Sequence, residues 1–304
     1  MDKKIAIQGV SGSFHEIAAR HYFNGGTFQL VQCNSFNALF DALKFGEANY
    51  AVVAIENSVA GSIIPNYAHI KDSGLKILGE VYLRIEQHLV GLPGQQIDEV
   101  KEIHSHPMAI EQCGEYLNSL RRKGVRIIDS EDTALSAKRI SEGELRDVAG
   151  ISSRLAAEIY HLEILDEGIE TNKKNFTRFL ILSAEENGVK GAMPNKSGIC
   201  FKLPHEQGSL SQALSVLAFY KINLTKIQSL PIVGQEWQYL FYVDLVFSDY
   251  EKYRLALKAI EPLTSELQVL GEYRQGERPT ANQPVIPSEQ MLNRAGSNPL
   301  NHQL

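Results

Sequence analysis

Between Lys3 and about Ser183, short runs of β-branched and apolar residues alternate with longer segments of helical period. Such alternation is typical of an α/β protein, because helices cover the sheet between successive strands. The pattern predicts strands at residues 4–8, 28–33, 51–55, 76–83, 100–105, 125–128, 147–151 and 176–182. It predicts helices at residues 15–23, 36–45, 108–121, 133–140 and 154–160. Residues 75–93 hold two strand-like runs without a clear helix between them, so we expect residues 1–185 to form two lobes, with crossings near 75–93 and 150–175.

A second pattern follows residues 186–196, a stretch with Gly, Pro and Asn that is typical of a linker. Residues 197–274 give the order strand, helix, strand, strand, helix, strand, with a turn at Gly234. This βαββαβ order predicts a ferredoxin-like domain. Residues 275–304 have no apolar periodicity and contain several prolines, so we expect a disordered or loosely attached tail.

Composition excludes several classes of protein. A formal net charge of −6 provides no general basic field for nucleic acid, and no segment has the roughly 20 apolar residues that span a membrane. The three cysteines are far apart and form no CxxC, so we expect neither a disulfide framework nor a cysteine zinc site. The sequence also starts without the apolar stretch of a signal peptide, which favours a cytoplasmic protein.

One pattern resembles a metal-binding motif, but its spacing does not fit a metal site. His15-Glu16 resembles the start of HExxH, but the next histidine is His21 rather than the residue four positions after His15. The two imidazoles therefore do not share the helix face that zinc requires. We expect no metal.

Loops that follow strands should carry the chemistry, since ligands of open α/β sheets bind at the carboxyl ends of strands. After the first strand, Ser11 and Ser13 stand in a glycine turn at the start of a helix, where unpaired N–H groups bind anions. A simple tight turn explains the same residues. After the third strand, Glu56-Asn57-Ser58 is followed by Gly61; a helix N-cap is the alternative to a binding loop.

Two further strand ends are polar. Ser105-His106-Pro107 precedes a helix that contains Gln112, and His106 is a candidate acid, a helix cap or a packed loop residue. In the strand near residue 180, Thr177 and Phe179 share one face, whereas Arg178 points to the other. A buried arginine needs a partner, which is either a protein carboxylate or an anionic ligand.

Together these motifs, with Cys113 and Asn175, resemble the motif set of prephenate dehydratases. The unit at 197–274 resembles the ACT domain that follows the catalytic region in that family, with Gly208-Ser209-Leu210 and Asn223-Leu224-Thr225 in the expected places. The resemblance implies a two-lobed catalytic region like a type II periplasmic binding protein, with the substrate in the cleft between the lobes.

The same resemblance implies a lyase that converts prephenate to phenylpyruvate and needs no cofactor, because aromatisation drives the reaction. It implies catalytic roles for Thr177, Asn57 and Gln112, and an acidic family position at Glu131. The implied substrate-binding residues are Ser11, Ser13, Glu56, Ser58, Gly61, Ser105, His106, Arg178 and Phe179. Arogenate dehydratase and a non-catalytic amino-acid or solute sensor are the alternatives.

Regulation by L-phenylalanine is likewise implied by the ACT resemblance. The implied effector residues are Gly208, Ser209, Leu210, Asn223, Leu224, Gln228 and Ser229. Here the chain departs from the family, because Gln228-Ser229-Leu230-Pro231 replaces the usual Glu-Ser-Arg-Pro. ACT sheets of this family commonly pair between subunits, which implies a homodimer or a dimer of dimers.

Overall fold

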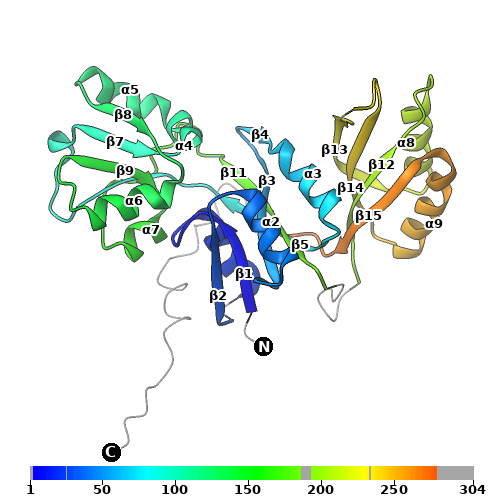
Figure 1. Cartoon of the computed structure of the whole chain (residues 1–304). Coiled ribbons are helices and arrows are strands. Elements are labelled where there is room, and N and C mark those ends of the chain that lie inside the picture. Colours follow the sequence, from blue (N-terminus) through cyan, green and yellow to red (C-terminus); the bar gives the residue numbers. More distant parts are fainter. Residues whose placement is uncertain (1–2, 25, 186–192, 233, 279–304) are drawn as a thin grey trace, which may run out of the picture. The chain divides into compact units, whose positions relative to one another are not determined.

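The computed structural model describes residues 3–24, 26–185, 193–232 and 234–278 (Figure 1). These residues form two compact units. The first takes in the described residues up to Ile63, then Val81–Phe179 and Arg278, and the second takes in Ile64–Glu80 and the described residues of Leu180–Glu277. The units do not follow the linear order of the predicted domains, because residues 64–80 belong with the C-terminal part of the chain.

The first sheet has the strand order β2-β1-β3-β11-β5, with β4 paired to β3. Its strands are β1 (Lys3–Gln8), β2 (Phe28–Cys33), β3 (Tyr50–Asn57), β4 (Gly61–Ser62), β5 (Lys76–Arg84) and β11 (Phe176–Ser183). The helices α1 (Phe14–Phe23) and α2 (Phe36–Lys44) connect its parallel strands. Ser13 and Ser35 begin these helices, since their hydroxyls accept backbone N–H groups of the first turn.

The second sheet has the order β10-β6-β9-β7-β8. Its strands are β6 (His88–Gly91), β7 (Glu102–Ser105), β8 (Arg126–Asp129), β9 (Val148–Ser152) and β10 (Glu163–Asp166). Around it lie a 3₁₀ turn, η1 (Ile97–Glu99), and the helices α4 (Pro107–Gln112), α5 (Gly114–Arg122), α6 (Thr133–Glu142) and α7 (Arg154–Ile159). The chain passes from the first sheet to the second between β5 and β6, and returns between β10 and β11.

The prediction of one helix over residues 108–121 is wrong, since α4 and α5 are separate helices. Cys113 joins them with φ −98° and ψ 16°, which is not a helical conformation. The following glycine, Gly114, weakens the helix at this point. The short strands β4 and β10 were not predicted; β4, with two residues, is too short for a periodicity to be seen.

The second unit contains an antiparallel sheet of order β13-β14-β12-β15. Its elements are β12 (Lys196–Lys202), α8 (Ser209–Phe219), β13 (Asn223–Pro231), β14 (Tyr239–Val246), α9 (Tyr250–Ile260), η2 (Glu261–Leu263) and β15 (Ser265–Tyr273). Helix α3 (Ile64–Ser73), which the sequence did not reveal, belongs to this unit. Gly271 is required here, because a Cβ would stand 2.2 Å from the carbonyl oxygen of Ile77.

A buried ion pair lies inside the second unit. Nζ of Lys196 is 2.7 and 2.9 Å from the two carboxylate oxygens of Glu80, and neither side chain is exposed. The backbone N–H of Gly276 donates to the same carboxylate, and that of Gln275 donates to Asn195. The first residues of the predicted tail are therefore held by hydrogen bonds, in contrast to the expectation of a loose segment; residues 279–304 lie outside the described part.

The linker prediction needs a smaller change. Strand β12 begins at Lys196, inside the predicted linker, whose residues 186–192 are outside the described part.

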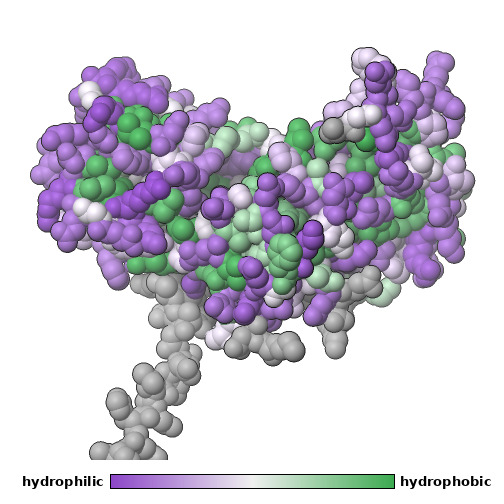
Figure 2. Space-filling model, viewed as in Figure 1, coloured by the Kyte–Doolittle hydropathy of each residue, from purple (hydrophilic) through white to green (hydrophobic). Residues whose placement is uncertain are grey.

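The face of the molecule seen in Figure 2 is largely hydrophilic, with apolar residues in small groups. Within the residues that the structure describes, no helix has the length and apolar composition to cross a bilayer.

Candidate active site

A cavity of about 430 Å³ opens within the first unit. It is lined by residues of strands of the first sheet, of helix starts and of the loops beside them. Its polar lining residues are Gln8, Ser13, His15, Asn57, Ser62, Gln87, His106, Gln112, Asp132, Thr133 and Thr177. Its apolar lining includes Phe14, Phe36, Ile63, Ile85, Met108 and Phe179. A cavity of this volume that combines apolar walls with convergent polar groups is typical of a small-molecule site.

The side chain of Asn57 is fixed on both sides. Its Oδ1 accepts the backbone N–H groups of Val59 and Ala60 at 2.9 and 2.8 Å, in the turn between β3 and β4. Its Nδ2 donates to Asn175 Oδ1 at 2.7 Å and to Thr177 Oγ1 at 2.9 Å. Because Thr177 accepts from Asn57, its own hydroxyl proton is available to a ligand.

Asn175 continues this arrangement toward Gln112. Nδ2 of Asn175 donates to Gln112 Oε1 at 2.9 Å, and Nε2 of Gln87 donates to the same oxygen at 3.3 Å. Gln112 thus uses its oxygen within the protein and keeps its N–H₂ group for the cavity. We call Asn57, Asn175, Gln112 and Gln87, which are all uncharged, the amide chain; with Thr177 it presents fixed donors to one cavity.

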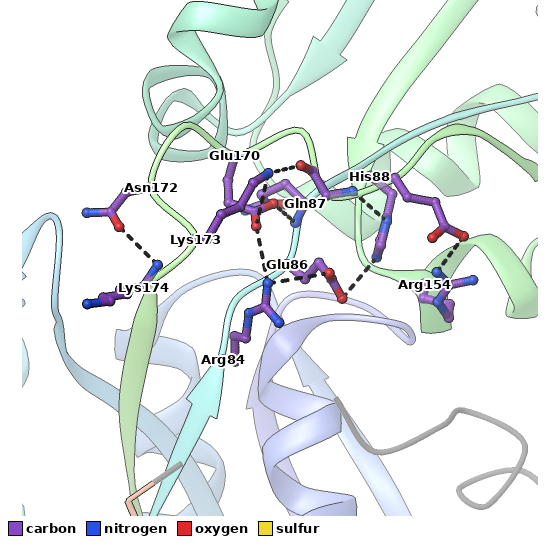
Figure 3. A network of polar contacts seen from close by, with 11 residues as sticks. Arg84, Glu86, Gln87, His88, Arg154, Glu170, Asn172, Lys173 and Lys174 are labelled. Atoms are coloured by element: carbon purple, nitrogen blue, oxygen red, sulfur yellow. Dashed lines mark hydrogen bonds and ion pairs between the residues drawn. The ribbon is translucent and has the colours of Figure 1, made fainter. Parts of the chain in front are cut away.

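Behind Gln87, the two connections between the sheets meet in a polar network (Figure 3). The buried carboxylate of Glu170 accepts the backbone N–H of Gln87 at 3.0 Å. Arg84 and Lys173 lie 3.9 and 3.6 Å from the other carboxylate oxygen. The network holds the backbone of Gln87 at the base of the amide chain.

The loop after β1 also contacts the start of α7 within the first unit. The hydroxyl of Ser153 donates to the carbonyl of Gly12 at 2.6 Å. A Cβ at Gly12 would stand 2.6 Å from Ala156 Cα, and its φ is +88°, so only glycine fits. The glycine turn that the sequence offered as an anion loop therefore also serves as a packing contact.

The cavity lining contains no Lys or Arg among the described residues. The starts of α1 and α6, each ten residues long, both contribute their first residues to the lining, and the N-terminal end of a helix carries a partial positive charge. One carboxylate, Asp132, lies in the lining as the N-cap of α6, where it accepts the N–H of Leu135. Burial raises the pKa of Asp132.

Two histidines line the same cavity. Burial lowers the pKa of His15 to about 3, so its ring is neutral at ordinary pH. Burial also lowers the pKa of His106, against the opposing effect of Asp132 and Asp129. His106 caps α4, since its Nδ1 accepts the N–H of Met108 at 3.2 Å, and Pro107 occupies the first turn as the sequence suggested.

The structure brings together the three residues predicted to be catalytic, since Thr177, Asn57 and Gln112 all line the cavity. Four of the predicted binding residues also line it: Ser13, Gly61, His106 and Phe179. The other five do not: Ser11, Glu56, Ser58, Ser105 and Arg178.

Each of these five has a contact within the protein. Arg178 Nη1 is 3.5 Å from Glu56 Oε1. Of the two alternatives given for a buried arginine, a protein carboxylate or an anionic ligand, the structure therefore shows a protein carboxylate. The other three take part in hydrogen bonds: Ser58 Oγ to Lys174 O, Ser105 Oγ to Ile151 O, and Gln32 Nε2 to Ser11 Oγ. The strand that carries Thr177 therefore turns Arg178 to its opposite face.

Glu131 does not line the cavity either. It is exposed and paired with Arg139 at 2.7 Å, which lowers its pKa. The carboxylate that reaches the cavity belongs to its neighbour, Asp132.

The predicted effector residues all lie in the second unit. Gly208, with φ +87°, begins α8, where Ser209 and Leu210 form the first turn. Asn223, Leu224, Gln228 and Ser229 lie on β13, an outer strand of its sheet.

Sequence reasoning did not assign Gln87, His15 or Asp132 to the site, and it gave Asn175 no role. Only Asn175 carried a usable signal, since it stands two residues before Thr177 at a strand start. Gln87 and His15 contact the cavity through long-range packing. No group of three or more His, Cys, Asp or Glu in the described ranges is placed to hold a metal ion.

Comparison with known proteins gives a consistent result. Residues 5–187 match the family model "Prephenate dehydratase". "Arogenate dehydratase/prephenate dehydratase 1, chloroplastic" of Arabidopsis thaliana is 36% identical over 285 residues, covering 89% of this chain and 71% of that protein.

Two solved structures are similar over most of the chain. A prephenate dehydratase in complex with L-Phe from Arthrobacter aurescens has a TM-score of 0.79 at 26% identity, covering 94% of each chain. GqqA, described as a novel type of quorum quenching acylase, has a TM-score of 0.80 at 29% identity, covering 90% of this chain and 98% of that one.

Proposed function

The chain belongs to the prephenate dehydratase family, and we propose that it catalyses the decarboxylating dehydration of prephenate to phenylpyruvate. The observation that carries this proposal is the amide chain. It fixes Asn57 and Gln112 and leaves two kinds of uncharged donor for a ligand, the Thr177 hydroxyl and the Gln112 amide N–H₂.

The reaction needs little more than such donors. The electron pair of the ring carbon–carboxylate bond moves into the ring as CO₂ leaves, and the carbon–oxygen bond opposite breaks to release hydroxide, which takes a proton and becomes water. A hydrogen bond from Thr177 to the departing oxygen stabilises the charge that develops on it. A threonine hydroxyl is too weak an acid to supply the proton alone, so we assign it a donor or relay role.

Binding of the substrate, a dianion, is assigned to backbone rather than to basic side chains. The first turn of α1, beyond the N–H group that Ser13 caps, is the start of a helix at the cavity and is assigned to the substrate, whereas the carboxylate of Asp132 already caps the first turn of α6. The buried ring of Phe179 provides an apolar wall. A carboxylate that loses its charge as CO₂ reacts more readily in such surroundings than in water.

The direct test is a prephenate turnover assay on the purified chain, with Thr177→Ala as the variant. Loss of one aligned donor should lower kcat by about 10² to 10³. Thr171→Ala, in the loop before β11, is the matched control and should keep activity. Normal turnover by Thr177→Ala would contradict the assigned role.

Three alternatives to this function differ in what an assay would detect. Arogenate carries an amino group where prephenate has the pyruvyl carbonyl, so a higher kcat/KM on arogenate would overturn the substrate assignment. An acylase activity, suggested by the likeness to GqqA, would show as amide hydrolysis. The cysteines are no nucleophiles for it, because all three are buried and burial raises the pKa of each thiol. A protein that binds prephenate stoichiometrically without turnover would be a sensor.

We further propose that residues 197–274 are an ACT domain that binds L-phenylalanine, and that residues 1–185 are a two-lobed catalytic domain like a periplasmic binding protein. The βαββαβ order of the second unit supports the first assignment, as does the solved relative in complex with L-Phe. The residues assigned to the effector are those at the start of α8 and on β13. Pairing of such sheets in a homodimer or a dimer of dimers belongs to the same proposal.

The test of regulation is a phenylalanine titration that follows activity and oligomer size together. An effect on either at millimolar phenylalanine supports the proposal, and no effect on both contradicts it. Replacement of Gln228 by Glu, which restores the family's residue, should strengthen the response.

A cytoplasmic location is proposed on the three free, buried cysteines, which suit a reducing compartment.

A further inference from the structure

His15 is the one part of the His15-Glu16 motif that reaches the cavity, and the proposed reaction gives it no role so far. It is the second residue of α1, and its side chain lines the cavity although only 8% of the residue is exposed. Its neighbour Glu16 has a different task. The carboxylate of Glu16 accepts the N–H of Gly12 and pairs with Arg20, which closes the first turn of the helix.

The imidazole of His15 is held in one orientation. Its Nε2 accepts the backbone N–H of Ala54 at 3.4 Å. The rings of Phe36 and Phe179 pack edge-on against it, with centroids 5.7 and 5.1 Å away. Since Nε2 is an acceptor, the ring proton of the neutral form lies on Nδ1.

The ring remains neutral over the working pH range. Burial among aromatic side chains lowers the pKa of His15 to about 3. The other titratable groups of the cavity lining are His106 and Asp132, and the Glu16 carboxylate on the same helix is balanced by Arg20. Within the described part of the chain no hydrogen bond is made by Nδ1, and this atom is not among the buried side-chain atoms that lack a partner, so we infer that it is open to the cavity that His15 lines.

We propose that Nδ1–H of neutral His15 donates a hydrogen bond to an oxygen of the bound substrate and thereby helps to select the substrate. The proposal rests on the proposed function for the identity of that substrate. A neutral donor suits this chemistry, because a cation at the same place would stabilise the carboxylate of the ground state and oppose the loss of CO₂. The ring also contacts Phe179, which lies two residues from Thr177 on the same strand face.

Kinetics of two variants test the proposal. His15→Phe keeps the aromatic packing but removes the donor, and should lower kcat/KM for prephenate by about 10- to 100-fold. His15→Gln restores a neutral donor and should recover most of this loss. His21→Phe, an exposed position of the same helix, is the matched control and should leave kcat/KM unchanged. A merely structural role predicts a lower Tm for His15→Phe with unchanged kcat/KM, and that result would overturn the proposal.

Nitrogen NMR of histidine-labelled protein provides a readout independent of turnover. We expect His15 to be neutral and protonated on Nδ1 from pH 5 to 8, with an Nδ1 shift that changes when phenylpyruvate or, in Thr177→Ala, prephenate is added. An Nε2-protonated or charged ring at pH 7, or a resonance unmoved by both ligands in an enzyme that turns over prephenate, overturns the inference. An inactive wild-type protein would refute the proposed function, and the donor assignment would still be supported if the Nδ1 shift of its neutral ring changed on addition of prephenate, and overturned if it did not.

Discussion

The amide chain of the first unit and the ion pair of the second unit both consist of largely buried polar side chains, but their hydrogen-bonding groups are paired to different extents. Lys196 and Glu80 meet at 2.7 Å, fully buried, and Gly276 adds a further N–H to the carboxylate. The amide chain of the first unit carries no charge. The oxygens of Asn57, Asn175 and Gln112 accept hydrogen bonds within the protein, whereas that of Gln87 is buried without a partner and the N–H₂ group of Gln112 is left for the cavity.

The difference separates a structural cluster from a reactive one. A buried charge requires full compensation, because an unpaired ion in the protein interior is very unfavourable. Uncharged amides can leave a donor unused at a cavity wall at a much smaller cost, since water or a ligand fills the place. Incomplete pairing beside a cavity is therefore the better indicator of function, and full pairing inside a core indicates stability.

The largest expected effect comes from breaking the ion pair. Lys196→Met should lower the free energy of unfolding by about 3 to 5 kcal/mol, because Glu80 is left buried without its partner. Denaturant unfolding measures this, with Lys202→Met on the same strand as the control. Lys202 pairs with the exposed Glu266, and such a pair contributes at most about 1 kcal/mol. Equal losses of unfolding free energy in the two variants would show that the buried pair contributes no more to stability than the exposed one.

Breaking the amide chain should affect the reaction instead. Asn175→Ala removes one of the hydrogen bonds that hold Asn57 and the shorter of the two that hold Gln112, which loosens the alignment of both, so kcat on prephenate should fall by about 10² to 10³ while the protein stays folded. Steady-state kinetics together with circular dichroism decide this. Asn172→Ala, in the same loop but bonded only to the backbone of Lys174, is the control and should keep its activity. Full activity of Asn175→Ala would show that the amide chain is only structural.

Acid should destabilise the first unit through its buried histidines. Burial, with a contribution from Arg154, lowers the pKa of His88 to about 4. The unfolded chain therefore binds a proton below pH 6.5 that the folded chain does not, and stability falls as the pH falls from about 6.5 toward 4. At pH 5 His88 alone should remove roughly 2 kcal/mol.

Urea unfolding of the wild type and of His88→Gln, at pH 7.5 and at pH 5, measures how much of the loss of unfolding free energy is due to His88. The variant should lose less stability on acidification, whereas His21→Gln, at an exposed position, should behave as the wild type does. An identical pH dependence of the wild type and His88→Gln would contradict the neutral state of His88.

The smallest effect is expected at the far end of the amide chain. Gln87→Leu removes one long hydrogen bond to Gln112, of 3.3 Å, while Asn175 still holds the same oxygen. A single neutral hydrogen bond contributes about 1 kcal/mol, so kcat should fall about fivefold. A loss as large as that of Asn175→Ala would mean that Gln87, and with it the Glu170 network, positions the site.

Local sequence signals were sufficient to single out Asn57, at the end of β3, and Thr177, at the start of β11, because a polar residue beside an apolar run is visible within a few positions. They failed where the outcome depends on distant partners. Strand parity placed Arg178 opposite Thr177, yet only the structure shows that Glu56 is its partner, 122 positions away. Helix α3 was not recognised, because its apolar residues show little helical periodicity.

The sequence by itself determined the α/β alternation and the βαββαβ order of the second unit, since these depend on periodicity, and its resemblance to prephenate dehydratases indicated the three side chains proposed for catalysis. The tertiary structure decided which of those side chains share a cavity, which carboxylate reaches it, and that Lys196 closes a pair with Glu80. The physical reason is that burial, and the hydrogen bonds that burial requires, join residues more than 100 positions apart. A pattern within a few residues carries no record of such partners.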